Sequence, residues 1–144
     1  MFKLVLNEAI HTEVILGRVQ QAEKFVWIVT ADIKDMHVKM GRKFVPFLRV
    51  LNDLVSKGVA IRLIHAKEPG PRFRKDFDLY PELRDSELFE RILCPRTHTK
   101  AIVVDGEFLF VGSANLTGAG MGGRSKDKRN FEAGMITDEK KNHR

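Results

Sequence analysis

Two short apolar runs joined by Asp105-Gly106 constrain the fold of this 144-residue chain more than any other feature. Residues 99–104 and 107–111 are rich in β-branched and apolar side chains, which is typical of strands. Asp-Gly is a preferred pair for a two-residue type I′ turn, because both central residues of that turn need a positive φ. The segment therefore predicts a tight β-hairpin with Val104 opposite Glu107.

This register predicts which side chains share a face of the hairpin. Lys100 is expected opposite Val111 and His98 opposite Ser113, so alternation places His98, Lys100, Ser113 and Asn115 together at one end. The other hairpin residues are apolar on both faces, which predicts a mixed α/β fold, with the sheet between helices, rather than an all-β domain. The two predicted faces consist of Ala101, Val103, Phe108 and Phe110, and of Ile102, Val104, Leu109 and Val111.

The polar cluster at the end of the hairpin suits an anionic substrate. The Lys100 ammonium, the Asn115 amide and the Ser113 hydroxyl can all hydrogen-bond to the non-bridging oxygens of a phosphate. The His98 imidazole can attack phosphorus or move a proton, because an unperturbed imidazole has a pKa of about 6.5 and is partly neutral at physiological pH. Asp105 lies at the turn, away from this cluster, and is expected to support the hairpin.

The length and the 43% hydrophobic content predict one domain over residues 1–144, and periodicity predicts the remaining elements. A strand, a helix and a second strand follow one another between residues 25 and 64, and this order predicts a parallel strand pair with a right-handed crossover. The expected helices are 7–21, 44–57 and 82–88, and Asn7 is expected to cap the first of them. The expected further strands are 25–30, 59–64, 89–93 and 130–137.

The charge balance favours a polyanionic partner. Lys and Arg total 25 against 19 Asp and Glu, which gives a net charge of +6. Basic residues gather in 34–43 and 122–129, and the second of these segments follows the polar cluster directly. The chain has a single cysteine, no apolar run long enough to span a membrane and no signal-peptide pattern, so a cytoplasmic location is expected.

The spacing of the polar residues resembles the signature of the phospholipase D superfamily. The matching residues are His98, Lys100, Asp105, Gly112, Ser113 and Asn115. The resemblance implies a mixed sheet with helices on both faces, and phosphodiester cleavage or transfer through a histidine nucleophile, with no metal ion and no other cofactor. It also implies that Glu132 orients the His98 imidazole, for which the alternative is a solvent-facing glutamate on an edge strand.

The resemblance further implies a homodimer with a shared active site. A phosphorylated His98 cannot protonate the leaving oxygen, so a second acid is needed, and superfamily members with one copy of the motif pair two chains. The loop 118–129 is then expected to line the substrate groove.

Three functions fit these features. The first is a nuclease on DNA or RNA, and the second is a phospholipase D or phosphatidyl transferase on phospholipids. The third is a non-catalytic module that binds phosphate or nucleic acid, which the intact motif disfavours. No zinc-binding or nucleoside-triphosphate-binding motif is present.

Overall fold

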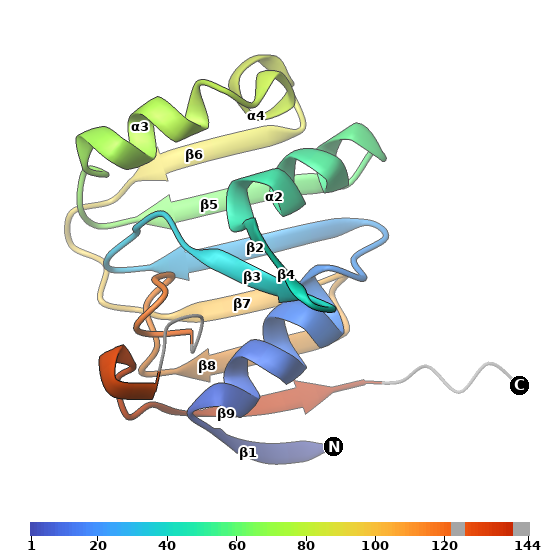
Figure 1. The fold of residues 1–144 in the computed structure, drawn as a ribbon. Helices are drawn as coiled ribbons and strands as arrows, with labels where there is room; N and C mark the ends of the chain where they lie inside the picture. The colour runs from blue at the N-terminus through green and yellow to red at the C-terminus, as the bar shows by residue number, and fades with distance from the viewer. Residues whose placement is uncertain (122–125, 140–144) are drawn as a thin grey trace, which may run out of the picture.

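The computed structural model describes residues 1–121 and 126–139, and within them it contains one seven-stranded mixed sheet. The strands lie in the order β1-β9-β8-β7-β2-β5-β6 (Figure 1). They are β1 (Phe2–Leu6), β2 (Phe25–Thr30), β5 (Ala60–His65), β6 (Phe89–Leu93), β7 (Ala101–Val104), β8 (Phe108–Gly112) and β9 (Ala133–Asp138). The other elements are α1 (Glu8–Ile10), the π-helix η1 (His11–Val19), β3 (His37–Met40), β4 (Lys43–Pro46), α2 (Phe47–Ser56), α3 (Pro71–Phe77), α4 (Pro81–Asp85) and the 3₁₀ turn η2 (Lys126–Lys128).

Strands β2, β5 and β6 run parallel, and the rest of the sheet is antiparallel. The predicted parallel pair is confirmed, with Phe25 opposite Ala60 and Thr30 opposite His65. The connection from β2 to β5 contains the β3–β4 hairpin and α2, and the connection from β5 to β6 contains α3 and α4. The carboxyl ends of β2, β5 and β6 consequently lie at one edge of the sheet (Figure 1).

The core lies between the sheet and the helices. The predicted apolar stripe of the first helix is buried. The stripe predicted for 44–57 is buried from Phe47 onwards, but Phe44 is exposed, because it lies in β4 and α2 begins only at Phe47. The buried apolar side chains of these two helices include Ile10, Val14, Ile15, Val19, Phe47, Leu48, Leu51 and Val55.

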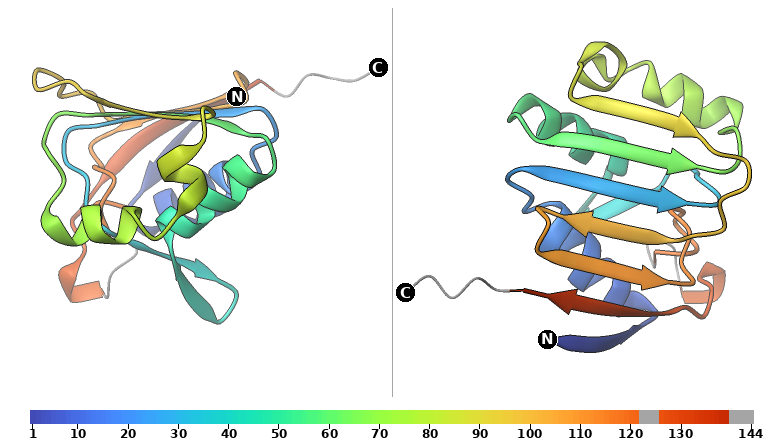
Figure 2. Two further views of the ribbon diagram at one scale, coloured as in Figure 1. Left: turned by 90° about the horizontal axis from the view of Figure 1, so that it is seen from above. Right: turned by 180° about the vertical axis from the view of Figure 1, so that it is seen from behind.

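The mixed α/β fold is confirmed, but one detail of the prediction is wrong: the described helices cover one face of the sheet, not both. Figure 2 shows the sheet in front of the helices when the molecule is seen from behind, and all helices on one side of the sheet when it is seen from above. The connections from β1 to β2, β2 to β5 and β5 to β6 all advance across the sheet in the same direction. Right-handed crossovers that advance in one direction place their helices on the same face.

The opposite face of the sheet is mostly apolar, with the Arg62–Glu90 ion pair as an exception, and it is not covered by any described helix. One row of side chains crosses all seven strands of this face in register. The row consists of Leu4, Met135, Val111, Ala101, Val29, Ile64 and Ile92. The strands are therefore apolar on both faces, as predicted.

The β7–β8 hairpin forms, but its predicted register is wrong by one residue. Val104 pairs with Phe108, so Glu107 stays outside the ladder while its N–H still donates to the Val104 carbonyl at 3.1 Å. Asp105 and Gly106 have the positive φ values that the turn requires, 55° and 73°. The turn residues were thus predicted correctly, and the additional residue Glu107 shifts the strand pairing.

This shift changes which side chains share a face. The Gly112 N–H donates to the Lys100 carbonyl at 3.2 Å, so Gly112, and not Val111, lies beside Lys100. A shift of one residue exchanges the two faces of one strand relative to the other. The buried, helix-facing side chains are Ile102, Val104, Phe108 and Phe110, and Ala101, Val103, Leu109 and Val111 lie on the outer face.

Other segments also differ from the sequence prediction. The basic segment 34–43 was assigned no strand, but it contributes β3, which pairs with β4. Strand β1 was not predicted and pairs with β9 at the edge of the sheet. No helix in residues 1–121 or 126–139 is long and apolar enough to cross a membrane.

Candidate active site

The polar residues of the motif, apart from Asp105, lie at the edge of the sheet where the carboxyl ends of β2, β5 and β6 are found. His98 and Lys100 immediately precede β7, Ser113 follows β8, and Glu132 immediately precedes β9. The carboxyl end of β2 lies at the same edge, beside β7 (Figure 1). Antiparallel pairing of β7, β8 and β9 brings these distant segments together, because the start of one strand lies beside the end of its neighbour.

The side chain of Asn115 is fixed by the backbone at the end of β2. Its Oδ1 accepts hydrogen bonds from the N–H groups of Ala31 at 3.2 Å and Asp32 at 3.1 Å. Because Oδ1 is the acceptor, the amide orientation is determined, and the Nδ2 group keeps both protons for another partner. Asn115 thus presents a donor of fixed orientation to the edge of the sheet.

Thr30 holds the same region in place from inside the protein. It is buried, its Oγ1 donates to the Asp32 carbonyl at 2.6 Å, and it accepts from the N–H of Leu116 at 2.9 Å. These bonds connect the end of β2 to the segment that carries Asn115. Gly120 packs closely against the backbone of Asn115, since a Cβ at position 120 would lie 2.5 Å from the Asn115 carbonyl oxygen.

The Lys100 side chain contacts the backbone of His98. The Lys100 Nζ donates to the His98 carbonyl oxygen at 3.1 Å, and the His98 side chain is exposed. The His98 imidazole makes no hydrogen bond with a described residue. Both ring nitrogens are therefore accessible to a substrate.

Ser113 and Glu132 form a hydrogen-bonded pair. The Ser113 Oγ donates to the Glu132 carboxylate, and it accepts from the Ala133 N–H at 3.1 Å. A hydroxyl group has one proton, so Ser113 cannot donate to a phosphate while it donates to Glu132. The predicted contact of Glu132 with His98 is absent from the structure.

Asn7 fixes the backbone at Glu132 instead of capping the first helix. Its Oδ1 accepts from the Glu132 N–H, and its own N–H donates to the Glu132 carbonyl, both at 2.9 Å. No side-chain cap of the helix is present, and Asn7 has a φ of 51°. The N-terminal segment thus fixes the position of Glu132, the residue immediately before β9.

Asp105 lies at the opposite edge of the sheet from the other motif residues. Its carboxylate accepts from the N–H groups of Glu23, Lys24 and Phe25, with the shortest of these contacts 2.7 Å long. Partial burial by itself would raise the pKa of the Asp105 carboxyl, but these hydrogen bonds together outweigh it and lower that pKa. The contacts connect the hairpin turn to the start of β2.

The motif glycine Gly112 lies where no side chain fits. A Cβ there would be 2.6 Å from the Ala133 carbonyl oxygen and 2.9 Å from the Phe110 ring. Gly134 lies opposite Gly112 on β9, and its Cβ would be 2.3 Å from the same ring. The two glycines make room for the buried Phe110 ring beneath the edge of the sheet.

A polar depression of 270 Å³ lies beside Asn115, and its wall includes Asp32, Lys34 and Gly118. The loop predicted to line the groove, 118–129, is only partly described, because residues 122–125 lie outside the described part of the chain. Within it, Gly118 and Ala119 do line the depression, and Arg129 forms an ion pair with Glu8 at 2.6 Å. Among the described residues, no three His, Cys, Asp or Glu side chains lie together in a way that could hold a metal ion.

The family whose sequence model is described as "Cardiolipin synthase, PLD-like domain" matches residues 15–144, which is most of the chain. The chain belongs to the phospholipase D superfamily. Members of this superfamily are phosphodiesterases. No curated protein sequence matches the chain.

Solved structures with a phospholipase D-like fold are similar over nearly the whole chain. NucT from Helicobacter pylori is 16% identical with a TM-score of 0.64, and the match covers 96% of this chain and 87% of NucT. Nuc from Salmonella typhimurium, a phospholipase D family member, is 14% identical with a TM-score of 0.61, covering 96% and 84%. The archaeal chromatin protein TrmBL2 is 12% identical with a TM-score of 0.58, covering 96% of this chain and 45% of TrmBL2. At these identities, the similarity shows the fold alone.

Sequence reasoning missed three residues of this phospholipase D-like edge: Thr30, Asn7 and Gly120. Thr30 carried a signal, since it is a polar residue at the end of an apolar strand. Gly120 belongs to a glycine-rich stretch, a pattern that does not indicate a specific contact, whereas the structure packs it against the Asn115 backbone. Asn7 carried no local signal for its contact, because Glu132 is 125 residues away in the sequence.

Proposed function

We propose that this protein is a metal-independent phosphodiesterase that cleaves nucleic acid through a phosphohistidine intermediate on His98. One observation supports this proposal above the others: an accessible imidazole, a lysine ammonium and an amide donor of fixed orientation share one edge of a rigid sheet. The family membership supports the same class of reaction.

The proposed reaction has two displacements at phosphorus. A neutral nitrogen of His98 attacks the phosphodiester, the N–P bond forms, and the P–O bond to the leaving alcohol breaks. An acid gives that oxygen a proton. Water then attacks the phosphohistidine, loses a proton to the same group and releases a phosphate monoester with His98 restored. Lys100 and the Asn115 Nδ2 donate to the non-bridging oxygens as their negative charge develops.

Ser113 and Glu132 have a shared role in this proposal. Because the Ser113 proton is directed to Glu132, the pair connects the residue after β8 to the residue before β9. Ser113 can donate to a phosphate oxygen only after its hydroxyl group has turned away from Glu132, so that the hydrogen bond to Glu132 is replaced by one to the substrate. The Glu132 carboxylate then becomes available to the His98 imidazole, the role that the superfamily resemblance implies.

The acid is proposed to be His98 of a second copy of the chain. Phosphorylated His98 has no proton to give, and the chain carries one copy of the motif. A twofold dimer that joins the two motif edges supplies a second imidazole to the same phosphate. The active enzyme is therefore proposed to be a homodimer with one shared site.

Nucleic acid is the proposed substrate because the chain is basic, with a net charge of +6. The similarity to the fold of TrmBL2, whose structure shows a mode of DNA binding, is compatible with this choice. Phosphatidyl transfer on phospholipids is the second candidate, because the description of the matching family names cardiolipin synthase.

The test is hydrolysis by the purified protein of single-stranded DNA, RNA, bis(4-nitrophenyl) phosphate and phosphatidylglycerol vesicles. We expect turnover of the nucleic acids and of the small diester, unaffected by EDTA, and no turnover after His98→Asn. Arg62→Gln is a matched control, because Arg62 lies on the outer face and contacts Glu90 and Trp27 away from the motif edge.

Three results would contradict the proposal. A folded His98→Asn variant with a tenth of the wild-type rate excludes a histidine nucleophile. Loss of activity in EDTA that one divalent ion restores excludes the metal-independent mechanism. DNA binding without turnover of any diester identifies a non-catalytic module.

A further inference from the structure

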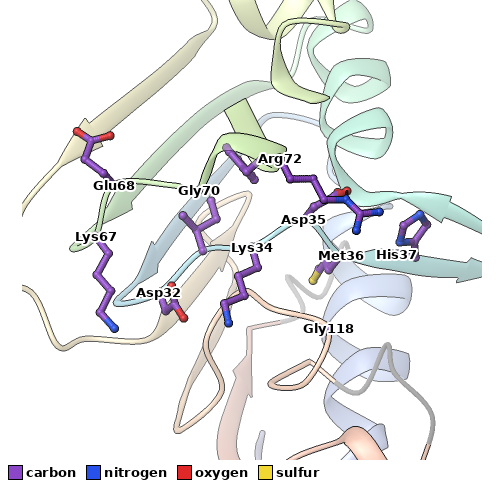
Figure 3. A pocket seen from close by; sticks show the side chains of 12 residues that line it. Asp32, Lys34, Asp35, Met36, His37, Lys67, Glu68, Gly70, Arg72 and Gly118 are labelled. Atoms are coloured by element: carbon purple, nitrogen blue, oxygen red, sulfur yellow. Dashed lines mark ion pairs between the residues drawn. The ribbon is translucent and has the colours of Figure 1, made fainter. Parts of the chain in front are cut away.

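A second cavity, of 400 Å³, lies next to the candidate active site. Figure 3 shows it between the segment that follows β2 and the segment that leads from β5 into α3. We call it the flanking cavity. Its volume is within the range of about 300 to 1,000 Å³ that is usual for small-molecule sites.

The flanking cavity adjoins the polar depression beside Asn115. Asp32, Lys34 and Gly118 line both hollows. Asp32 also donates its backbone N–H to the Asn115 amide oxygen, so the boundary between the two hollows is part of the structure that orients Asn115. A group attached to a phosphate at Asn115 can therefore extend past Lys34 into the flanking cavity.

The wall of this cavity combines apolar and charged side chains. Ile33, Met36 and Phe73 are at most 4% exposed and supply apolar surface. The side chains of Lys34 and Lys67 are exposed, and neither forms an ion pair with a described residue. An acyl chain in this space would remove charged groups from water without compensation. A nucleobase has flat apolar faces and a polar edge, and its phosphates suit the two lysines.

Asp35 supplies an unused hydrogen-bond acceptor in the same wall. Its Oδ1 is buried and has no hydrogen-bond donor among the described residues. Asp76 lies beside it, but two carboxyl groups can share a hydrogen bond only when one is protonated. Burial, followed by the hydrogen bond and charge of Asp76, raises the pKa of Asp35 to about 6. At neutral pH the Asp35 Oδ1 therefore has no hydrogen-bond donor, and an N–H group of a nucleobase could be that donor.

We propose that the flanking cavity binds the nucleotide next to the scissile phosphate, with its base against Met36 and Phe73 and its phosphates at Lys34 and Lys67. The base edge donates to Asp35. This proposal rests on the proposed phosphodiesterase function and assigns the nucleic-acid specificity of the enzyme to the segments after β2 and β5.

The test compares two substrates that share the reaction but not the flanking nucleotide: a mixed-sequence single-stranded oligodeoxynucleotide and bis(4-nitrophenyl) phosphate. The variant is Lys34→Gln with Lys67→Gln, and the matched control is Lys57→Gln, an exposed lysine that follows α2. We expect the ratio of kcat/KM for the oligonucleotide to kcat/KM for the small diester to fall at least about tenfold in the double variant and to stay constant in the control.

Binding gives a second measurement that does not depend on turnover. The oligonucleotide affinity of the His98→Asn protein is measured by fluorescence anisotropy at several salt concentrations. With the two lysine substitutions added, the slope of log Kd against log salt should decrease by about 1.4, which is about 0.7 for each phosphate contact on a single strand. Thermal unfolding shows whether all variants remain folded.

The outcomes separate the two proposals. An equal loss on both substrates, or an unchanged salt slope, overturns the nucleotide site and leaves the phosphodiesterase intact. Lower turnover of phosphatidylglycerol vesicles with unchanged oligonucleotide cleavage also overturns it, since the cavity would then accept a lipid headgroup. Failure of the phosphodiesterase itself is recognised separately, by a His98→Asn protein that keeps its activity on the small diester.

Discussion

The two ends of the Asn115 amide have different tasks. The oxygen accepts from the Ala31 and Asp32 N–H groups, and the nitrogen is available to a substrate. A carboxylate of the same shape would keep the first task and lose the second, because it has no protons to donate. A single substitution can therefore separate the structural contribution of Asn115 from its proposed catalytic contribution.

We expect Asn115→Asp to fold normally and to lose activity by about 100- to 1,000-fold, the usual effect of removing a donor to a developing charge. Asn115→Ala should lose activity and also about 1 to 3 kcal/mol of unfolding free energy, because two backbone N–H groups lose their acceptor. Kinetics on bis(4-nitrophenyl) phosphate and urea unfolding measure the two effects. An active Asn115→Asp enzyme contradicts the proposed role of the amide.

The carboxyl group of Asp35 is expected to make the free energy of unfolding depend on pH. Its pKa is about 6 in the folded protein and about 3.9 in an unfolded chain. Between these values the folded state binds more protons than the unfolded state, so Asp35 lowers the stability as pH rises from about 4 to 6, and the loss persists above pH 6. Asp35→Asn should therefore stabilise the protein by about 1 to 2 kcal/mol at pH 7.5.

The gain from Asp35→Asn should shrink towards zero at pH 4, where the wild-type carboxyl is protonated in the folded state. Urea unfolding at pH 4, 5, 6 and 7.5 measures this dependence. A gain that is the same at every pH contradicts it, because an effect of shape alone does not titrate. The groups nearest Asp35 that act on the same pKa are Asp76, His37 and Arg72.

At the scale of elements, the junction of β8 and β9 depends on two glycines facing one aromatic ring. Gly112 and Gly134 lie opposite each other, and the Phe110 ring fills the space that their side chains would occupy. The position of Ser113 and Glu132 follows from this packing, since both residues lie immediately beyond it.

Gly112→Ala should destabilise the protein by about 2 to 3 kcal/mol, because its methyl group would overlap the Ala133 carbonyl and the Phe110 ring. Gly70→Ala is the control: a Cβ at this position would have no neighbour within 4 Å, and its φ is an ordinary −64°, so its effect should stay within about 1 kcal/mol. Thermal unfolding of both variants decides this, and equal stability of the two contradicts the packing argument.

At the scale of the whole molecule, the proposed mechanism predicts a dimer. Sedimentation at micromolar concentration should give about twice the chain mass of 16.5 kDa. Wild-type subunits mixed with an excess of His98→Asn subunits should form heterodimers with little activity, because each shared site then has one histidine. A monomeric protein with full activity overturns the shared site.

Local patterns predicted the elements that bury a continuous apolar face. The helix stripes from Ile10 to Val19 and from Leu48 to Val55, and the strand pair β2 and β5, follow from periodicity alone. The motif spacing from His98 to Asn115 indicated the superfamily, because six residue types at fixed distances are a property of the sequence. The positive φ of Asp105 and Gly106 was also predictable from residue type.

The tertiary structure decided what depends on contacts between distant segments. The additional residue Glu107 in the β7–β8 turn is set by pairing over the whole sheet, and a local turn rule cannot detect it. The helices lie on one face because three crossovers advance in the same direction, which depends on the strand order. Asn7 reaches Glu132, and Asn115 reaches Ala31 and Asp32, only because sheet pairing brings those segments to one edge. The sequence by itself thus determined the chemical groups of the site and the elements that carry them, and tertiary packing decided their partners, because hydrogen bonds between segments about 80 to 125 residues apart leave no periodic signal in the chain.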